Sequence, residues 1–249
     1  MKKILLIFVI LFPSVLFGTE TAHHRTIVVI APHPDDAEAS CGGLIANSVS
    51  AGDSVIILTM TGGELGIWGK SKDEARAIRT VEAHNAAAVL GASVVFFGAI
   101  DASLAVDSTS TQHLIEMLLP MNPDIVLAPW PLDVHSDHQA SGLLAWRVFL
   151  NKQFTFDLYF YETSNSPHTK TFQFVPTDYI DITDVIKKKQ EALYKQKSQG
   201  PADWWGMYEQ MAIVHGYETD VPYAEAYIKA RSFSGMGGRQ GVTGKTLDK

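Results

Sequence analysis

The sequence predicts an α/β fold of the Rossmann-like, three-layer type, with a mostly parallel sheet between two layers of helices. Short β-branched runs alternate with longer stretches of helical periodicity up to about residue 150. Strands that are joined by helices form right-handed crossovers, which place successive strands parallel to one another. The hydrophobic fraction of the chain, 46% of 249 residues, is sufficient for a sheet that is buried on both faces.

The expected elements follow from this alternation in chain order. Residues 26–31 (TIVVIA) and 54–61 (SVIILTMT) are continuous apolar runs, typical of buried strands. Pro32 and Pro34 keep their preceding residues extended, so the intervening helix is expected from about residue 38 to residue 50. The other expected strands are 94–99 and 124–130, and the other expected helices are 73–90, 111–119 and 137–150.

The C-terminal part of the chain has a weaker pattern. Residues 158–163 and 179–183 are expected strands, at a sheet edge, and residues 184–196 are an expected helix. After Gly200 the sequence is rich in aromatic residues and glycine, which fits either the wall of a substrate cleft or a helical cap on the core. Because no internal repeat or long linker divides the chain, residues 19–249 are expected to form a single domain.

The N-terminal segment has the pattern of an export signal. Lys2 and Lys3 precede an apolar stretch over residues 4–17, which is shorter than the ~20 residues of a spanning helix. We therefore expect residues 1–18 to be a signal peptide, and the mature protein to be secreted or periplasmic. Leu16 is large for its place before a cut at Gly18, so an uncleaved N-terminal anchor is the alternative.

Charge and cysteine content argue against several kinds of partner and site. The formal net charge is −7, and the 20 basic residues are dispersed apart from the cluster at 187–189. Nucleic acids and anionic membranes require concentrated positive charge, so we expect neither as a partner beyond the membrane contact of the export signal. The single cysteine, Cys41, excludes an intramolecular disulfide.

Two short segments are dense in residues that bind metal ions. The segment HPDD (33–36) follows the first strand, and HSDH (135–138) follows the strand that ends at Trp130. Both are expected at the carboxyl edge of the sheet, where loops of an α/β fold converge. Each segment alone could be a helix cap, but two such segments at one edge predict a common metal site.

These residue types suit metal-assisted hydrolysis. A catalytic zinc ion takes three nitrogen or oxygen ligands from the protein and leaves one position for solvent. It lowers the pKa of a water molecule to about 7, and a neighbouring carboxylate can then accept the water's proton. A further histidine can stabilise the oxyanion or protonate the leaving nitrogen. The two segments supply every one of these groups.

Residues 31–46 (APHPDDAEASCGGLIA) and 133–140 (DVHSDHQA) resemble the two signatures of the LmbE/PIG-L family of zinc-dependent N-acetylglucosaminyl deacetylases. The resemblance extends over about residues 26–199, including the stretch LTMTGGELG at 58–66. It implies an LmbE-like fold and a metal-dependent amidohydrolase, an N-deacetylase that acts on carbon–nitrogen bonds other than peptide bonds. The partner that it implies is an N-acetyl sugar, either a small molecule or an oligosaccharide.

The same resemblance implies roles for particular residues. His33, Asp36 and His138 would bind Zn²⁺, or another divalent metal ion, and Asp35 would be the general base. The remaining implied site residues have catalytic or substrate-binding roles. These are His135, which would stabilise the oxyanion or act as an acid, Asp137, which would tune or orient His135, and Arg79 and Asp101, which would contact the sugar.

The chain departs from the family pattern at two places. Ala37 follows the paired aspartates, where many members carry glutamate, and Glu38 comes one position later. Gln196 stands where members often carry histidine, so a function of that histidine does not transfer to this chain. For Arg79 and Asp101, a salt bridge on a helix surface and a turn aspartate are the alternatives to sugar contact.

The function expected from these observations is hydrolysis of the acetamide of an N-acetylated sugar or glycoside, outside the cytoplasm, to acetate and a free amine. One alternative is a non-catalytic sugar- or nucleotide-binding protein on the same scaffold. The other is a metal-dependent hydrolase of a different ester or amide. The site residues do not separate the last alternative from deacetylation, because both reactions pass through a tetrahedral oxyanion.

Overall fold

The structure is a computed structural model that describes residues 24–151, 153–164, 173–231 and 243–244. The expected signal peptide, residues 1–18, lies outside this part of the chain. Within it, none of the helices combines the length and the apolar character that crossing a membrane requires.

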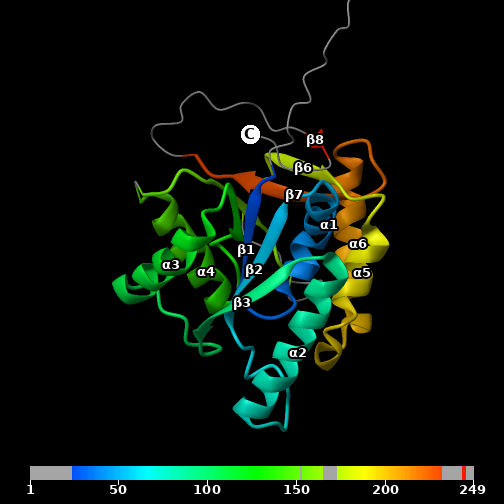
Figure 1. Ribbon diagram of the computed structural model, residues 1–249. Helices are drawn as coiled ribbons and strands as arrows, with labels where there is room; N and C mark the ends of the chain where they lie inside the picture. Colours follow the sequence, from blue (N-terminus) through cyan, green and yellow to red (C-terminus); the bar gives the residue numbers. More distant parts are fainter. Residues whose placement is uncertain (1–23, 152, 165–172, 232–242, 245–249) are drawn as a thin grey trace, which may run out of the picture.

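Eight strands form one sheet in the order β3-β2-β1-β4-β5-β7-β6-β8 (Figure 1). Among the strands that the structure describes, β7 alone runs antiparallel to its neighbours, so the sheet is mostly parallel as predicted. The strands are β1 (Thr26–Ala31), β2 (Ser54–Thr61), β3 (Ser93–Ala99), β4 (Ile125–Pro129), β5 (Asp157–Tyr161), β6 (Asp178–Asp181), β7 (Ala224–Lys229) and β8 (Thr243–Gly244).

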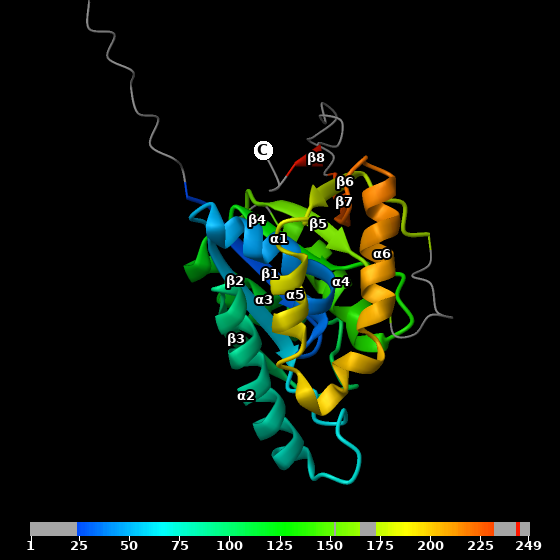
Figure 2. The same cartoon turned by 90° about the vertical axis from the view of Figure 1, so that its right-hand side faces the viewer.

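Helices cover both faces of this sheet. They are α1 (Asp36–Ser50), α2 (Lys72–Leu90), α3 (Ser108–Met121), α4 (Ser136–Phe149), α5 (Ile186–Leu193) and α6 (Trp205–Tyr217). Successive residues of β1 point to opposite faces: Ile27 packs in the core under α1, α2, α5 and α6, whereas Val28 packs in the core under α3 and α4. Figure 2 shows the first of these layers facing the viewer. The three-layer α/β prediction is therefore confirmed.

The largest difference from the predicted elements lies after Gly200. The helical cap is present as α6, but the chain then returns as β7, which inserts antiparallel between β5 and β6. The sequence pattern did not predict this strand. As a result β6 is not at the sheet edge, because it pairs with β7 on one side and with the two-residue strand β8 on the other.

A buried ion pair attaches β7 to the helical layer that carries the first motif. The Glu225 carboxylate accepts hydrogen bonds from the backbone N–H groups of Gly43 and Leu44, each at 2.8 Å. It also lies 2.7 Å from the Lys189 ammonium and accepts a hydrogen bond from the Tyr227 hydroxyl at 2.9 Å. Glu225 thus holds α1, the helix that begins at Asp36, in place against the sheet.

Replacing Lys189 by methionine is expected to lower the free energy of unfolding by about 3–5 kcal/mol, because the variant leaves the Glu225 carboxylate buried without its counter-charge. Urea denaturation of the two proteins measures the difference. The matched control is Lys187→Met, which removes an exposed lysine from the same helix and should change stability by about 0.5 kcal/mol or less. Equal effects of the two substitutions would contradict the role of the pair.

Candidate metal centre

Both predicted motifs lie at the carboxyl edge of the sheet, as expected. The HPDD segment connects β1 to α1, and HSDH begins α4 shortly after β4. Strands β1 and β4 are neighbours in the sheet although two other strands separate them in sequence. Residues more than 100 positions apart therefore meet, and the rings of His33 and His138 lie 5.2 Å apart, centroid to centroid.

The turn that presents the first motif is strained. Asp35 has a φ angle of 119°, which is rare for a residue with a side chain and costs on the order of 1–3 kcal/mol. Two sets of contacts hold it in place. The Arg79 guanidinium donates to the Pro34 carbonyl and to Asp35 Oδ2, the latter at 2.9 Å. The His33 N–H donates to Asp36 Oδ2 at 2.8 Å.

The side-chain atoms of the three predicted ligands form a compact triangle. His33 Nδ1 lies 3.3 Å from Asp36 Oδ2 and 3.3 Å from His138 Nε2. Asp36 Oδ2 lies 3.4 Å from His138 Nε2. Ligand atoms about 2.0–2.1 Å from a tetrahedral zinc ion are separated from one another by about 3.3–3.4 Å. The three residues therefore fit an ion of this size without rearrangement.

Each histidine of the triangle has a carboxylate at its other ring nitrogen. His33 Nε2 lies 3.2 Å from Asp137 Oδ2 and 3.3 Å from Asp101 Oδ1. His138 Nδ1 lies 2.8 Å from Thr163 Oγ1 and 3.2 Å from Asp133 Oδ2. Carboxylates in this position fix the tautomer and the orientation of metal-bound histidines. The sequence pattern indicated no role for Asp133 or Thr163.

Two other sets of donor atoms also lie within 4.8 Å of one another, namely His33 with His135 and His138, and His33 with Asp101 and Asp137. We prefer the predicted triangle for two reasons. All three of its edges are 3.3–3.4 Å, which matches tetrahedral coordination. In the other two sets, His135 Nδ1 accepts the N–H of Asp137, and both oxygens of the Asp137 carboxylate accept backbone N–H groups, from Ala102 and Leu104.

The charges of this cluster favour a bound cation. Burial alone would lower the pKa of His138, but Asp36 and Asp133 outweigh it and raise the pKa to about 9. Burial is likewise outweighed at His33, whose pKa is raised by Asp101, Asp137 and Asp36. The carboxylates therefore hold protons on both imidazoles of the metal-free protein. A divalent ion would replace those protons and would likewise neutralise the negative charge of the carboxylates.

Asp35 lies beside the triangle and has the properties of a proton acceptor. Burial raises its pKa to about 6, and the positive charge of Arg79 partly opposes this rise. A carboxylate with a pKa near neutrality accepts a proton more effectively than one with the usual pKa near 4. Its contact with Arg79 fixes the direction in which the carboxylate points.

His135 is brought to the centre, and Asp137 contacts its ring through the backbone N–H rather than through the carboxylate. The ring of His135 lies 4.7 Å from that of His33 and 5.0 Å from that of His138, between centroids. Its Nδ1 accepts the backbone N–H of Asp137 at 3.2 Å, so a neutral ring carries its proton on Nε2. The Asp137 carboxylate turns instead to His33 and to the loop after β3. Burial lowers the pKa of His135 and the charge of Asp137 opposes this lowering, so the tuning or orienting of His135 by Asp137 stays a prediction.

Arg79 and Asp101 contact the site rather than the surface. Arg79 is only 3% exposed, which rules out a salt bridge on the helix surface. Its guanidinium contacts Asp35, and it also donates to the Gly63 carbonyl at 3.4 Å. Asp101 lies in a turn but contacts His33. The contact of these two residues with a sugar stays a prediction.

Comparison with known proteins agrees with this geometry. Residues 28–149, which include both motifs, match the family model described as "PIG-L: GlcNAc-PI de-N-acetylase". This part of the chain is a PIG-L/LmbE family domain.

Its PIG-L/LmbE relatives include deacetylases. Diacetylchitobiose deacetylase of Thermococcus kodakarensis is 28% identical over 222 residues, which are 81% of each protein. The solved N,N'-diacetylchitobiose deacetylase from Pyrococcus horikoshii has a TM-score of 0.73 and 26% identity, and the match covers 86% of this chain and 87% of that one. These relatives confirm the expected enzyme class, a metal-dependent amidohydrolase.

The relatives also include a different kind of enzyme. The 4-oxalmesaconate hydratase of Pseudomonas putida is 25% identical over 210 residues, with 78% of this chain and 81% of the hydratase covered. Related chains of this length thus carry different reactions. The relatives alone therefore do not identify the substrate of this chain.

Proposed function

We propose that this chain is an exported, zinc-dependent N-deacetylase that hydrolyses the acetamide of an N-acetylated sugar or glycoside to acetate and a free amine. The observation that carries the proposal is the triangle of His33, Asp36 and His138, with Asp35 directly beside it. The diacetylchitobiose deacetylases among the relatives support a sugar substrate. The two lysines and the apolar stretch at the N-terminus support export.

The chemistry needs a water molecule that attacks the acetamide carbonyl carbon. A divalent ion held by His33, Asp36 and His138 would supply Lewis acidity, which acidifies water and favours negative charge on the carbonyl oxygen. Asp35 accepts the proton of the attacking water, since its carboxylate lies beside the triangle with a pKa raised to about 6. Arg79 keeps that carboxylate in position during the transfer.

The remaining site residues stabilise charge and hold the ligands. Burial, together with the neighbouring His33 and His138, lowers the pKa of His135, so its ring is neutral near pH 7. The proton on its Nε2 is then available to the carbonyl oxygen as negative charge develops there. Asp137 and Asp133 stay behind the two histidine ligands and keep their rings oriented.

The proposal is tested by metal analysis of the purified protein and by acetate release from a panel of N-acetylated mono- and oligosaccharides. We expect about one divalent ion per chain, as at other catalytic zinc sites, and acetate release that a chelator abolishes and Zn²⁺ restores. Turnover of other esters or amides without acetate release from sugars would favour the alternative hydrolase. Tight sugar binding without metal or turnover would favour the non-catalytic alternative.

A further inference from the structure

Large apolar side chains are exposed on the three loops that border the metal centre. The loops are 62–71 after β2, 100–107 after β3 and 130–135 after β4. We call these side chains the apolar rim; they are Leu65, Trp68, Ile100, Leu132 and Val134. Solvent-exposed residues of this size are ordinary when scattered, but a group around a functional site indicates a binding surface.

The rim is fixed to the site by short connections. The N–H of Leu65 donates to Asp101 Oδ2 at 3.0 Å, and Ile100 directly precedes Asp101. Val134 stands between Asp133 and His135, which both contact the centre. The backbone at these positions is therefore held by the site residues, while the apolar side chains point to solvent.

Trp68 is the most exposed member of the rim. It is fully exposed on a turn in which the Lys70 N–H donates to the Ile67 carbonyl at 3.3 Å and Gly69 has a φ angle of +78°. Its loop projects beyond the carboxyl edge of the sheet, between β2 and α2 (Figure 1). The base of this loop is anchored by Leu65, so the indole ring is displayed on a supported segment.

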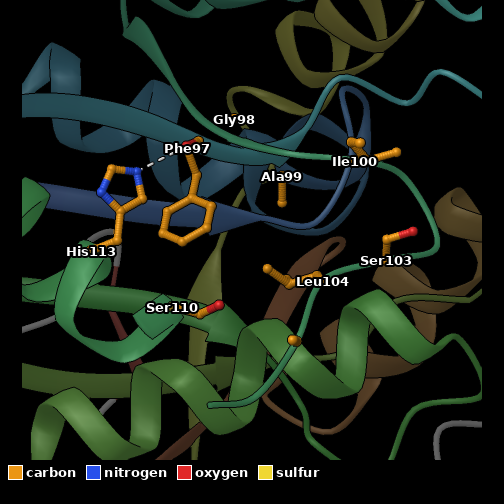
Figure 3. A pocket seen from close by; sticks show the side chains of 9 residues that line it. Phe97, Gly98, Ala99, Ile100, Ser103, Leu104, Ser110 and His113 are labelled. Carbon is orange, nitrogen blue, oxygen red and sulfur yellow. Dashed lines mark hydrogen bonds between the residues drawn. The ribbon is translucent and has the colours of Figure 1, made fainter. Parts of the chain in front are cut away.

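The rim continues into a hollow of about 390 Å³ beside Ile100 (Figure 3). Ala99, Ile100 and Leu104 give it an apolar wall, and Phe97 and His113 close its other end, where His113 Nε2 lies 3.1 Å from the Phe97 carbonyl oxygen. The loop after β3 contacts the metal centre through Asp101 and lines this hollow through Ile100. Its volume is that of a small-molecule site.

The charges near the rim disfavour an anionic ligand. The two arginines that contact these loops are already paired, Arg76 with Glu64 and Arg79 with Asp35. Lys70, the lysine of loop 62–71, lies 3.8 Å from the Glu74 carboxylate. The carboxylates of the metal centre lie directly behind the rim and would repel a phosphate or a carboxylate. The group that suits this surface is apolar and uncharged.

We propose that the apolar rim binds a neutral, apolar aglycone attached to the N-acetyl sugar whose acetamide enters the metal centre. This inference rests on the proposed deacetylase function and adds the chemical class of the rest of the substrate. The sugar occupies the metal centre, and the aglycone lies over Leu65 and Ile100 toward the hollow and Trp68. Binding of the aglycone removes apolar surface of both partners from water.

The test compares acetate release from the methyl and the benzyl β-glycosides of N-acetylglucosamine and from diacetylchitobiose, which extends the sugar with a polar group. In the unmodified protein, we expect a KM for the benzyl glycoside about tenfold below that for the methyl glycoside, with a similar kcat. Trp68→Ala and Ile100→Ala should each raise the KM for the benzyl glycoside by about 3- to 10-fold. Both variants should leave kcat and KM for the methyl glycoside unchanged.

The matched control is Leu119→Ala. Leu119 is exposed to the same degree as Ile100, 47% against 48%, but lies near the C-terminal end of α3, at the opposite edge of the sheet. This variant should keep the full preference for the benzyl glycoside.

The outcomes separate the two proposals. If no glycoside releases acetate, the proposed function fails. If acetate is released without a preference for the benzyl glycoside, or with a preference that neither rim variant reduces, the function stands and the rim proposal is overturned. A preference for diacetylchitobiose that the rim variants reduce would assign the rim to a second sugar and also overturn it. The rim proposal would also be overturned if the protein bound phosphatidylcholine vesicles, Trp68→Ala abolished that binding, and the benzyl glycoside were not preferred.

Discussion

Asp35→Asn is expected to lower kcat for acetate release by about 10²- to 10⁴-fold while the protein keeps its metal ion. The amide has nearly the shape of the carboxylate but does not accept the proton of the attacking water. The Asp35 carboxylate is not part of the ligand triangle, so the metal content should not change. Steady-state kinetics and metal analysis of the same preparation measure both quantities.

The fold should tolerate this substitution, because the asparagine amide oxygen can still accept the hydrogen bond of Arg79 and the charge of Arg79 stays near that of Asp101. Asparagine, like aspartate, is among the residues that adopt positive φ angles most readily, so the turn at 119° is not strained further. Asp73→Asn, on the exposed first turn of α2, is the matched control and should keep full activity. Full activity of the Asp35 variant would refute its role as the base, whereas loss of metal would make it a ligand.

Most of the fold was predictable because its signals are local. The buried parallel strands β1 and β2 are continuous apolar runs, and α2 ends where Gly91 adopts a φ angle of +82°, as a glycine stop predicts. These features depend on residues within a few positions of one another. The parallel direction of these strands followed from the crossover rule, which needs only the alternation of elements.

Strand β7 was not predictable on the same basis. Its sequence, AEAYIK, contains two alanines and a glutamate, which are poor strand formers. The strand is stable because Glu225 meets Lys189, Tyr227 and the backbone of α1, and Lys189 and α1 are far away in sequence. A buried charge whose partner comes from another element leaves no periodic signal.

The site shows the same division between local and distant information. The residue types of the two motifs, which are local information, predicted a metal site at this edge, and the resemblance to the family indicated which three residues are the ligands. Thr163, by contrast, follows β5 and reaches His138 only because β5 lies beside β4. The direction of the Asp137 side chain was also not predictable from the motif. The His135 ring caps the first turn of α4 by accepting the Asp137 N–H, and the Asp137 carboxylate faces the loop after β3.

His138→Ala is expected to remove the metal ion and, with it, acetate release. The substitution deletes one corner of the triangle, and two protein ligands hold zinc much less tightly than three. It also leaves the carboxylates of Asp36 and Asp133 facing each other without the imidazole that separates them. Added Zn²⁺ should not restore activity. His84→Ala, which removes an exposed histidine from α2, should keep both metal and activity.

Asp133→Asn distinguishes loss of the site from loss of the fold. This variant keeps all three ligands but changes the carboxylate that contacts His138 Nδ1, the Thr163 hydroxyl and the His135 N–H, so it should weaken metal binding by about 10- to 100-fold. Added Zn²⁺ should therefore restore its acetate release, unlike that of His138→Ala. If both variants lost activity without recovery and had the same low melting temperature, the effect would be on folding. If added Zn²⁺ instead restores acetate release by Asp133→Asn but not by His138→Ala, then His138 binds the ion and Asp133 orients the His138 ring.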